Sequence, residues 1–261
     1  MACIGGPAFF GAAPASTSTS APVNALAEPA FFFSPPARNG LVFIGAAGRR
    51  SNPKETVQLA LEDAARRVAL FYEVSGEYAV ENNVGSGAFD YTYNTHTALY
   101  YNQEGSKQYV AALQFNADTD TIEIENSLFI RTVYPSALPV PVNYRPVYHG
   151  SEQKPGWVDN PPLEIDGYEV GVGFSGRRSS LVDAYANSCN NAIFAIIRNV
   201  NTVSRSSDML YQNTGNLFGY KTSSDNITYS YGVLSGFYIL DTWIDPHAKT
   251  VWTLAITKKF D

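Results

Sequence analysis

Three glycines in the stretch VGVGFSGRRSS, at the spacing Gly171-x-Gly173-x-x-Gly176, match the glycine loop of dinucleotide-binding proteins. In those proteins the loop joins a strand to a helix whose N-terminus holds a pyrophosphate. The unit also requires a second parallel strand and an acidic residue about 20 positions beyond the glycines. Residues 198–201 contain no acid, and the segments that follow are typical of antiparallel strands. The spacing therefore favours a structural turn in which small residues let a helix pack closely on a strand, and we expect no cofactor.

Two arginine pairs follow these glycine turns, Arg49 with Arg50 and Arg177 with Arg178, and each pair precedes a predicted helix. Exposed N–H groups at a helix start attract anions, so arginines there are candidates for contact with a phosphate, a carboxylate or an acidic partner surface. Against this, a helix start repels positive side chains, and surface arginines often form only weak ion pairs. Both interpretations stay open.

The sequence offers little evidence for a catalytic or metal-binding arrangement of other residues. The histidines, His96, His149 and His247, accompany no nucleophile in a recognisable motif, and no zinc-ligand spacing is present. The acids of residues 116–125 (NADTDTIEIE) could hold calcium, but the segment lacks the glycine and final glutamate of an EF-hand and is more simply a hairpin turn. We expect no bound metal and no enzymatic activity.

The two cysteines have different interpretations. Cys189 lies in an apolar helical stripe, which favours a buried, inert thiol. Cys3 follows Ala2 and precedes a run of small residues, as at the end of a bacterial lipoprotein signal. The charged and long apolar regions of a signal peptide are missing. Either the numbered chain has lost most of its signal and Cys3 is lipidated, or Met1 is the true start and Cys3 is incidental.

The overall composition indicates a folded protein, because 45% of the 261 residues are hydrophobic and only 16% are charged. Seventeen tyrosines and fifteen phenylalanines favour a β-rich structure. A net charge of −6 with no basic stripe argues against nucleic acid as a partner. No apolar run reaches the ~18 residues of a membrane-spanning helix.

The chain divides into a flexible N-terminal tether (1–30), a first repeat (31–135), a proline-rich linker (136–154) and a second repeat (155–261). The repeats indicate a tandem duplication, since the same residues recur at a constant offset of 128. The matched pairs are Val42 and Val170, Gly45 and Gly173, Gly48 and Gly176, and Ala64 and Ala192.

Each repeat is expected to begin with a strand, continue as a long helix and end in antiparallel strands. Asn52 with Pro53 and Ser180 with Asp183 are predicted to start the helices. Asp241, beside Trp243, is expected at a solvated strand edge. The predicted fold class is α+β, with two tandem similar domains, each a long helix packed on a mainly antiparallel sheet. Strand-like segments are 97–101, 107–115, 120–125 and 127–134 in the first repeat, and 226–245 and 250–257 in the second.

The second repeat resembles the LPP-twenty family of bacterial outer-membrane lipoproteins, which includes lipoproteins of the flagellar basal disk. The similarity rests on PGWVDNPP (155–162), YEVGVGFSG (168–176), DAYANSCNNAI (183–193) and LSGFYILDTWIDPHAKTVWTLAIT (234–257) in that order. It extends more loosely over residues 31–134. Members of the family usually carry one such domain, so two in tandem depart from the pattern.

This resemblance implies a non-enzymatic envelope protein, held at the bacterial outer membrane by a lipid on Cys3, on its periplasmic face or at the cell surface. Its expected partners are other envelope proteins and further copies of itself, in an assembly such as a flagellar disk or ring. The alternative is a secreted or surface adhesin that binds a ligand through tyrosine-rich strands such as residues 89–101.

Overall fold

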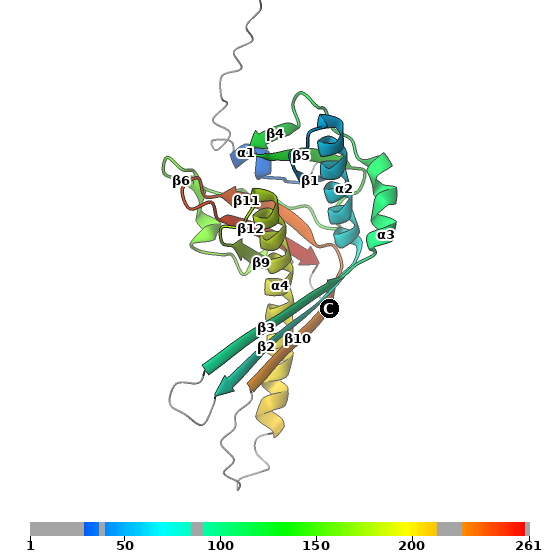
Figure 1. Cartoon of the computed structure of the whole chain (residues 1–261). Coiled ribbons are helices and arrows are strands. Elements are labelled where there is room, and N and C mark those ends of the chain that lie inside the picture. Colours follow the sequence, from blue (N-terminus) through cyan, green and yellow to red (C-terminus); the bar gives the residue numbers. More distant parts are fainter. Residues whose placement is uncertain (1–28, 37–39, 85–90, 213–225, 259–261) are drawn as a thin grey trace, which may run out of the picture.

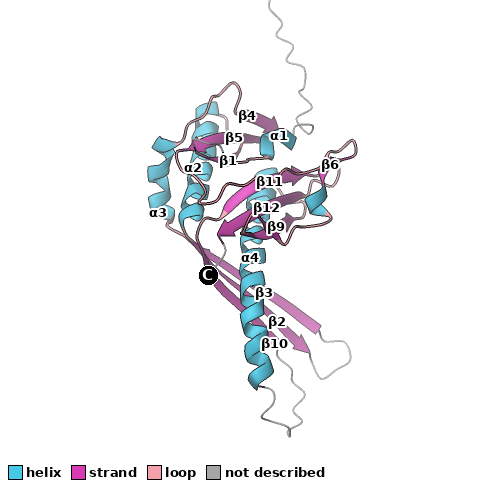
Figure 2. Ribbon diagram, turned by 180° about the vertical axis from the view of Figure 1, so that it is seen from behind, coloured by secondary structure: helices cyan, strands magenta, loops and turns pink. Residues whose placement is uncertain are grey.

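The computed structural model describes residues 29–36, 40–84, 91–212 and 226–258. Its elements form a body from which an arm projects, as Figure 1 and the view from behind in Figure 2 both show. The elements in chain order are helix α1 (Pro29–Phe32), strand β1 (Leu41–Gly48), helix α2 (Pro53–Tyr72), strands β2 (Val74–Val84) and β3 (Tyr91–Tyr100), helix α3 (Gln103–Ser106), 3-10 helix η2 (Lys107–Ala112), strands β4 (Thr121–Ile124), β5 (Ser127–Tyr134), β6 (Tyr148–His149) and β7 (Lys154–Pro155), 3-10 helix η3 (Gly156–Val158), strands β8 (Glu164–Ile165) and β9 (Tyr168–Ser175), helix α4 (Leu181–Gln212), and strands β10 (Asn226–Leu234), β11 (Tyr238–Ile244) and β12 (Val251–Lys258).

The body contains two larger antiparallel sheets, each with a helix packed on it, and the short two-stranded sheet β6-β7. The first has the strand order β1-β5-β4 and carries α2, and the second has the order β11-β12-β9-β8 and carries α4. This confirms the α+β class. Both helices begin as predicted: the Asn52 side chain accepts a hydrogen bond from the Lys54 N–H, with Pro53 in the first turn. At α4, the Ser180 hydroxyl accepts one from the Asp183 N–H.

Glycines inside β1 and β9 let the helix approach the strand closely. A Cβ added to Gly45 of β1 would overlap the carbonyl oxygen of Ala60 in α2. A Cβ added to Gly173 of β9 would overlap the carbonyl oxygen of Ser188 in α4. By contrast, a Cβ at Gly176 would meet no atom within 4 Å. Gly45 and Gly173 therefore serve close helix–strand packing, as the sequence indicates, whereas Gly176 does not.

The arm is a third sheet with the order β10-β2-β3, along which α4 runs (Figure 1). Strand β10 pairs with β2 of the first repeat, with Leu234 opposite Val74. The expectation that residues 226–234 belong to the sheet of the second repeat is therefore wrong. The reason is that Leu234 and Val74 share a buried cluster with α4, so burial on the long helix selects this pairing.

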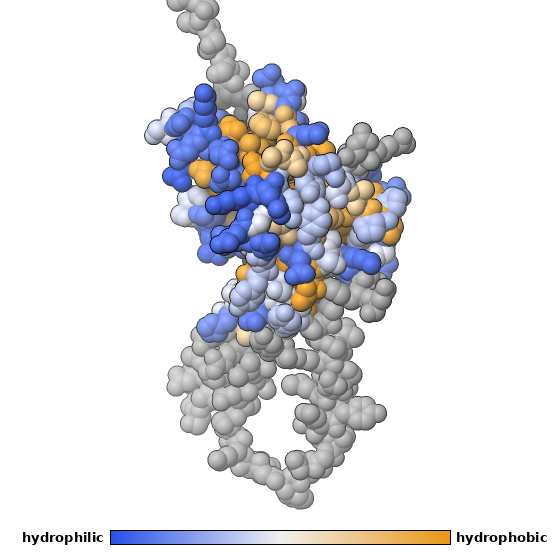
Figure 3. All heavy atoms as spheres, turned by 90° about the vertical axis from the view of Figure 1, so that its right-hand side faces the viewer, coloured by the Kyte–Doolittle hydropathy of each residue, from blue (hydrophilic) through white to orange (hydrophobic). Residues whose placement is uncertain are grey.

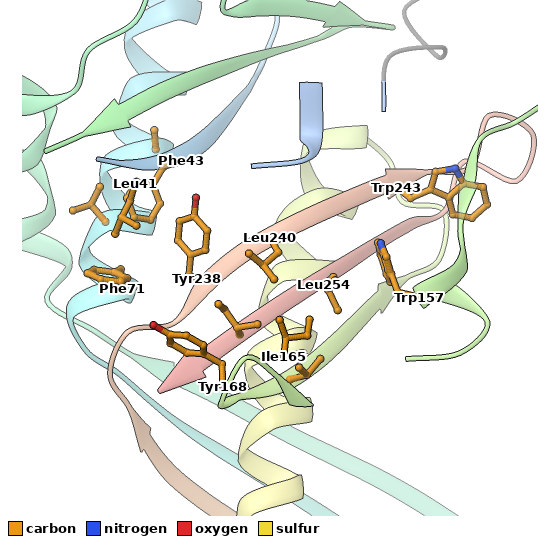
Figure 4. Close-up of a cluster of buried hydrophobic side chains, with 14 of the residues drawn as sticks. Leu41, Phe43, Phe71, Trp157, Ile165, Tyr168, Tyr238, Leu240, Trp243 and Leu254 are labelled. Atoms are coloured by element: carbon orange, nitrogen blue, oxygen red, sulfur yellow. The ribbon is translucent and has the colours of Figure 1, made fainter. Parts of the chain in front are cut away.

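One core cluster contains residues of both predicted repeats, 31–135 and 155–261. Figure 4 shows Tyr238 of β11 between Phe43 of β1 and Leu240, and the rings of Phe43 and Tyr238 meet edge to face with centroids 5.7 Å apart. Residues of the segment 136–154 also pack on this cluster, and the Tyr168 hydroxyl donates to the Val140 carbonyl at 2.8 Å. The segment between the repeats therefore lies against the second sheet.

The strand predicted at 107–115 is wrong, because these residues form η2 after the short helix α3. The cause is local: the Asn102 side chain accepts a hydrogen bond from the Gly105 N–H at 2.7 Å and so starts a helical turn. Tyr109 of η2 then stacks on Tyr72 of α2. A capping side chain and tertiary packing outweigh the strand propensity of this segment.

We predict that Gly173→Ala destabilises the protein and that Gly176→Ala does not. The first variant forces a methyl group against the backbone of α4, an overpacking that costs about 1–3 kcal/mol or more. The second adds a methyl group in open space, where loss of glycine freedom in the unfolded chain stabilises by about 0.4–1 kcal/mol at most. Urea unfolding of both variants measures the difference, and equal losses would contradict the close-packing role.

Candidate functional site

The two arginine pairs lie at the same end of the molecule. Arg49 and Arg50 line a surface pocket at the start of α2, and Arg177 and Arg178 line another at the start of α4. Glu125, in the turn between β4 and β5, lines both pockets. The fold thus brings together two pairs that are 128 positions apart in the sequence.

The charges at this end are partly neutralised by exposed ion pairs. Arg49 lies 3.6 Å from Glu123, and Lys249 lies 2.9 Å from Glu125. Pairs exposed to water contribute about 0–1 kcal/mol and hold no fixed geometry. The four arginines therefore remain candidates for an anion or an acidic partner, and surface pairing remains the alternative for Arg49.

The structure places the three histidines and the acidic turn in separate elements. His96 lies in β3, His149 in β6, and His247 in the turn before β12, where its Nε2 is 2.9 Å from Glu152. In the predicted turn, the Asp120 side chain accepts a hydrogen bond from the Asn116 N–H at 2.8 Å. Among the described residues, no group of three or more His, Cys, Asp and Glu is placed to hold a metal ion.

A constrained polar site lies at the free edge of β1. This strand pairs with β5 on one side only, so its alternate N–H and C=O groups on the other side need partners. Three side chains, those of two buried tyrosines and one partly buried aspartate, supply them instead of a strand. The Tyr238 oxygen accepts from the Val42 N–H at 3.2 Å, the Tyr185 hydroxyl donates to the Ile44 carbonyl at 3.2 Å, and Asp63 accepts from the Ala46 N–H at 3.0 Å.

We call this set of contacts the junction, because its members come from both repeats. Asp63 lies on α2 of the first, whereas Tyr185 and Tyr238 lie on α4 and β11 of the second. Burial raises the pKa of both tyrosines, so their hydroxyl groups stay protonated at neutral pH. The Tyr238 hydroxyl can therefore donate to the Ser34 carbonyl at 2.7 Å while it accepts from β1.

Asp63 is held ionised by two arginines of its own helix. Its Oδ1 accepts from Arg66 at 2.9 and 3.2 Å, and its Oδ2 accepts from Arg67 at 3.0 Å. Burial alone would raise the pKa of Asp63, but the charges of Arg67 and Arg66 and the Ala46 N–H outweigh it, and the pKa lies below its ordinary value. The charged carboxylate can thus accept from the strand edge.

A buried carboxylate, Asp241, corrects an expectation. It is 1% exposed and does not lie at a solvated edge. Its side chain accepts from the Trp157 indole at 2.8 Å, from the Tyr148 hydroxyl at 3.2 Å and from the Thr242 N–H at 2.9 Å. A register shift just before Asp241 places it opposite Leu254, on the face that Trp157 covers. The alternation of apolar and polar residues along a regular strand could not predict this β-bulge.

Sequence reasoning missed the junction, although one signal was present. Asp63 and Arg67 lie four positions apart beside the apolar residues Ala64 and Val68, so charged side chains occupy the buried side of a predicted helix. Charged residues are almost never fully buried unless they are paired. Tyr185 and Tyr238, however, are indistinguishable in the sequence from other aromatic residues of the core. Cys189 is buried, as predicted.

We predict that Tyr185→Phe and Tyr238→Phe each destabilise the protein by about 1–3 kcal/mol, because each leaves a buried backbone group of β1 without a partner. Tyr72→Phe is the matched control, since its hydroxyl meets that of Tyr134 at an exposed position. This control should change stability by less than about 0.5 kcal/mol. Denaturant unfolding tests all three, and no difference between buried and exposed variants would refute the role of the junction.

We predict that Asp241 makes the protein less stable as the pH rises from about 4 to 7. Burial raises the pKa of Asp241 from 3.8 to about 7, so in this window the folded state binds a proton that the unfolded state has released. By linkage, up to about 4 kcal/mol of stability present at low pH is lost by neutral pH. Asp241→Asn removes this dependence. The stability difference between wild type and variant, measured from pH 4 to 8, should change across the window, and a constant difference would exclude the effect.

Comparison with known proteins adds no assignment to this site. No family model matches the chain, and no curated protein and no solved structure is significantly similar to it. In the described part of the chain, no helix is long and apolar enough to cross a membrane. The resemblance to the LPP-twenty family therefore stays a prediction from short sequence motifs.

Proposed function

We propose that the protein is a non-enzymatic lipoprotein of the bacterial outer membrane that serves as a structural part of an assembly built from copies of itself. Cys3, the predicted site of the lipid, lies outside the described residues, so the anchor rests on the resemblance in sequence. The assembly role has support from one observation in the structure, the projecting arm (Figure 2).

Both outer strands of the arm have an unpaired side within the described residues. The order β10-β2-β3 gives β2 a neighbour on each side, but β3 and β10 only one. Such edges present rows of N–H and C=O groups that can pair with a strand of another chain. An arm that carries two such edges away from the body is suited to contact between copies.

The arm also presents large side chains on the face opposite α4. Gly76 of β2 lies against Ile197 of α4, so this position faces the helix. Because successive residues of a strand point to opposite faces of the sheet, the residues adjacent to such positions point away from α4. On that face Tyr100, Tyr231 and Val233 are 54%, 47% and 43% exposed. Exposed aromatic residues of this kind are enriched at protein interfaces.

The strand directions favour a head-to-tail contact between copies. Because β3 and β10 each run antiparallel to β2, they run parallel to each other. Pairing of β3 in one copy with β10 in the next is then a head-to-tail contact, which gives a ring where the rotation between copies closes and an open filament where it does not. A flagellum-associated disk or ring is the form of assembly that the resemblance suggests.

The side of the body that carries α2 and α3 offers less support for a contact between copies. Hydrophobic and hydrophilic residues are intermixed there (Figure 3). Apolar atoms make up much of any protein surface, so scattered hydrophobic residues do not identify an interface. We therefore place the self-contact on the arm.

We also infer that the two repeats arose by duplication. The order β1-β5-β4 in the first corresponds to β9-β12-β11 in the second. At the offset of 128, Asp63 binds the Ala46 N–H, and Asn191 donates to the Phe174 carbonyl at 2.6 Å. A common origin predicts that Gly45→Ala and Gly173→Ala cause similar losses of stability, and a loss at only one position would count against it.

Disulfide crosslinking tests the head-to-tail contact. In a Cys3→Ser background, the double variant Tyr100→Cys with Val233→Cys should form a ladder of oligomers under mild oxidation. Either single variant should give at most a dimer, because a head-to-tail contact needs both edges. The control pair, Tyr100→Cys with Asp118→Cys, places the second thiol in an exposed turn of the body and should form no ladder.

The remaining outcomes separate the alternatives. A monomer in light scattering, with no more crosslinking than the control, overturns the assembly role, and binding of a polysaccharide or host ligand then supports the adhesin. For the anchor, the wild-type protein should fractionate with membranes and Cys3→Ser with the soluble pool. Imaging of the cell envelope with and without the gene tests the flagellar association, since a lost disk or ring is expected.

A further inference from the structure

Three tyrosine rings meet at the surface, close to the point where the chain enters the arm. Tyr72 ends α2, just before β2 begins at Val74, whereas Tyr109 lies in η2 and Tyr134 ends β5. The Tyr72 and Tyr134 hydroxyl oxygens are 3.0 Å apart. The ring of Tyr109 stacks on that of Tyr72 with centroids 5.5 Å apart and meets that of Tyr134 edge to face at 5.8 Å. Phenols from three separate elements therefore form one cluster.

The contact between Tyr72 and Tyr134 brings together the parts of the two rings that react when phenols are oxidised. A phenoxyl radical carries its unpaired electron on the oxygen and on the neighbouring ring carbons, which are Cε1 and Cε2 in tyrosine. When two such radicals couple through these carbons, the hydroxyl groups of the product flank the new bond. The two hydroxyls already touch, and the ring centroids are 6.2 Å apart, so the rings need only approach each other to reach this arrangement.

The cluster is accessible to an oxidant. Tyr72 is 47% exposed, and Tyr109 and Tyr134 are partly buried. Burial and the hydrogen bond with Tyr72 raise the pKa of Tyr134 to about 12, so its hydroxyl is protonated at neutral pH. Oxidation of this phenol to a neutral radical must therefore remove a proton together with the electron. Water reaches the exposed side of the cluster and can take up that proton.

We propose that Tyr72 and Tyr134 form an oxidative crosslinking site, at which a peroxidase supplied with hydrogen peroxide joins a Cε carbon of one ring to a Cε carbon of the other. Each ring first loses one electron and its hydroxyl proton and becomes a phenoxyl radical. The two radicals form the carbon–carbon bond, and the hydrogens of the joined carbons move to the oxygens, which restores both hydroxyls. The two electrons and two protons released convert one hydrogen peroxide, whose O–O bond breaks, into two water molecules.

The crosslink ties the end of α2 to the end of β5. The two residues are 62 positions apart in the chain, so the new bond closes a long loop and restricts the unfolded state as a disulfide does. It also fixes the end of α2 from which β2 enters the arm. Oxidation therefore stabilises the body and the base of the arm together.

Oxidation of dilute protein in a Cys3→Ser background tests the site, because this change removes a competing thiol. After treatment with a peroxidase and hydrogen peroxide, the monomer fraction should gain dityrosine fluorescence and lose the mass of two hydrogen atoms. Peptide mapping by mass spectrometry should join Tyr72 to Tyr134. The Tm of the crosslinked monomer should rise by about 5–15 °C, the scale expected for a covalent bond across a loop of this length.

Two further variants control for the position of the crosslink. Tyr72→Phe keeps the ring but removes the phenol, so it should abolish the crosslink. Tyr100→Phe removes a tyrosine that is 54% exposed on the arm and should leave the crosslink unchanged. The proposal is overturned if the oxidised Cys3→Ser monomer contains no crosslink, if Tyr72 is joined to Tyr109 instead, or if Tyr72→Phe crosslinks as well as its parent.

Discussion

The architecture depends on a buried β-strand edge that no other strand covers. Strand β1 has β5 on one side, and its other side faces the interior between the two repeats. A backbone N–H or C=O group that is buried without a hydrogen-bond partner costs about 1–3 kcal/mol of stability, so the polar groups of this edge need partners. Two tyrosine hydroxyls and one carboxylate do this at fixed positions along the strand, and their placement determines how α4 and β11 approach β1.

This requirement explains why the repeats share their interior. Tyr238 serves the strand edge with its hydroxyl while its ring packs against Phe43 in the largest core cluster (Figure 4). The two carboxylates near this interior differ in charge balance. Asp63 lies between arginines that keep it ionised, whereas Asp241 has only neutral donors, which do not offset its burial. The pKa of one aspartate is therefore lowered and that of the other is raised within the same molecule.

Much of the local structure could be predicted from the sequence. The helix starts at Asn52 and Ser180, the turns, and the close packing at Gly45 and Gly173 follow from short-range chemistry that sequence patterns record. The pairing of β10 with β2 could not be predicted, because it is selected by burial against the far part of α4. The bulge before Asp241 and the partners of Tyr185 and Tyr238 depend on contacts between residues far apart in the chain, which carry no periodic signal.

The separation of these contacts along the chain has a consequence for how the protein forms. Tyr185 lies 141 positions after Ile44, and Tyr238 lies 196 positions after Val42. A chain synthesised from its N-terminus completes the sequence of β1 long before the residues that cover its edge exist. During that interval the strand is an open template for pairing with other chains, and distant contacts of this kind close slowly. Folding with the C-terminal half therefore competes with aggregation of the N-terminal half during synthesis. This competition favours slow expression at low temperature.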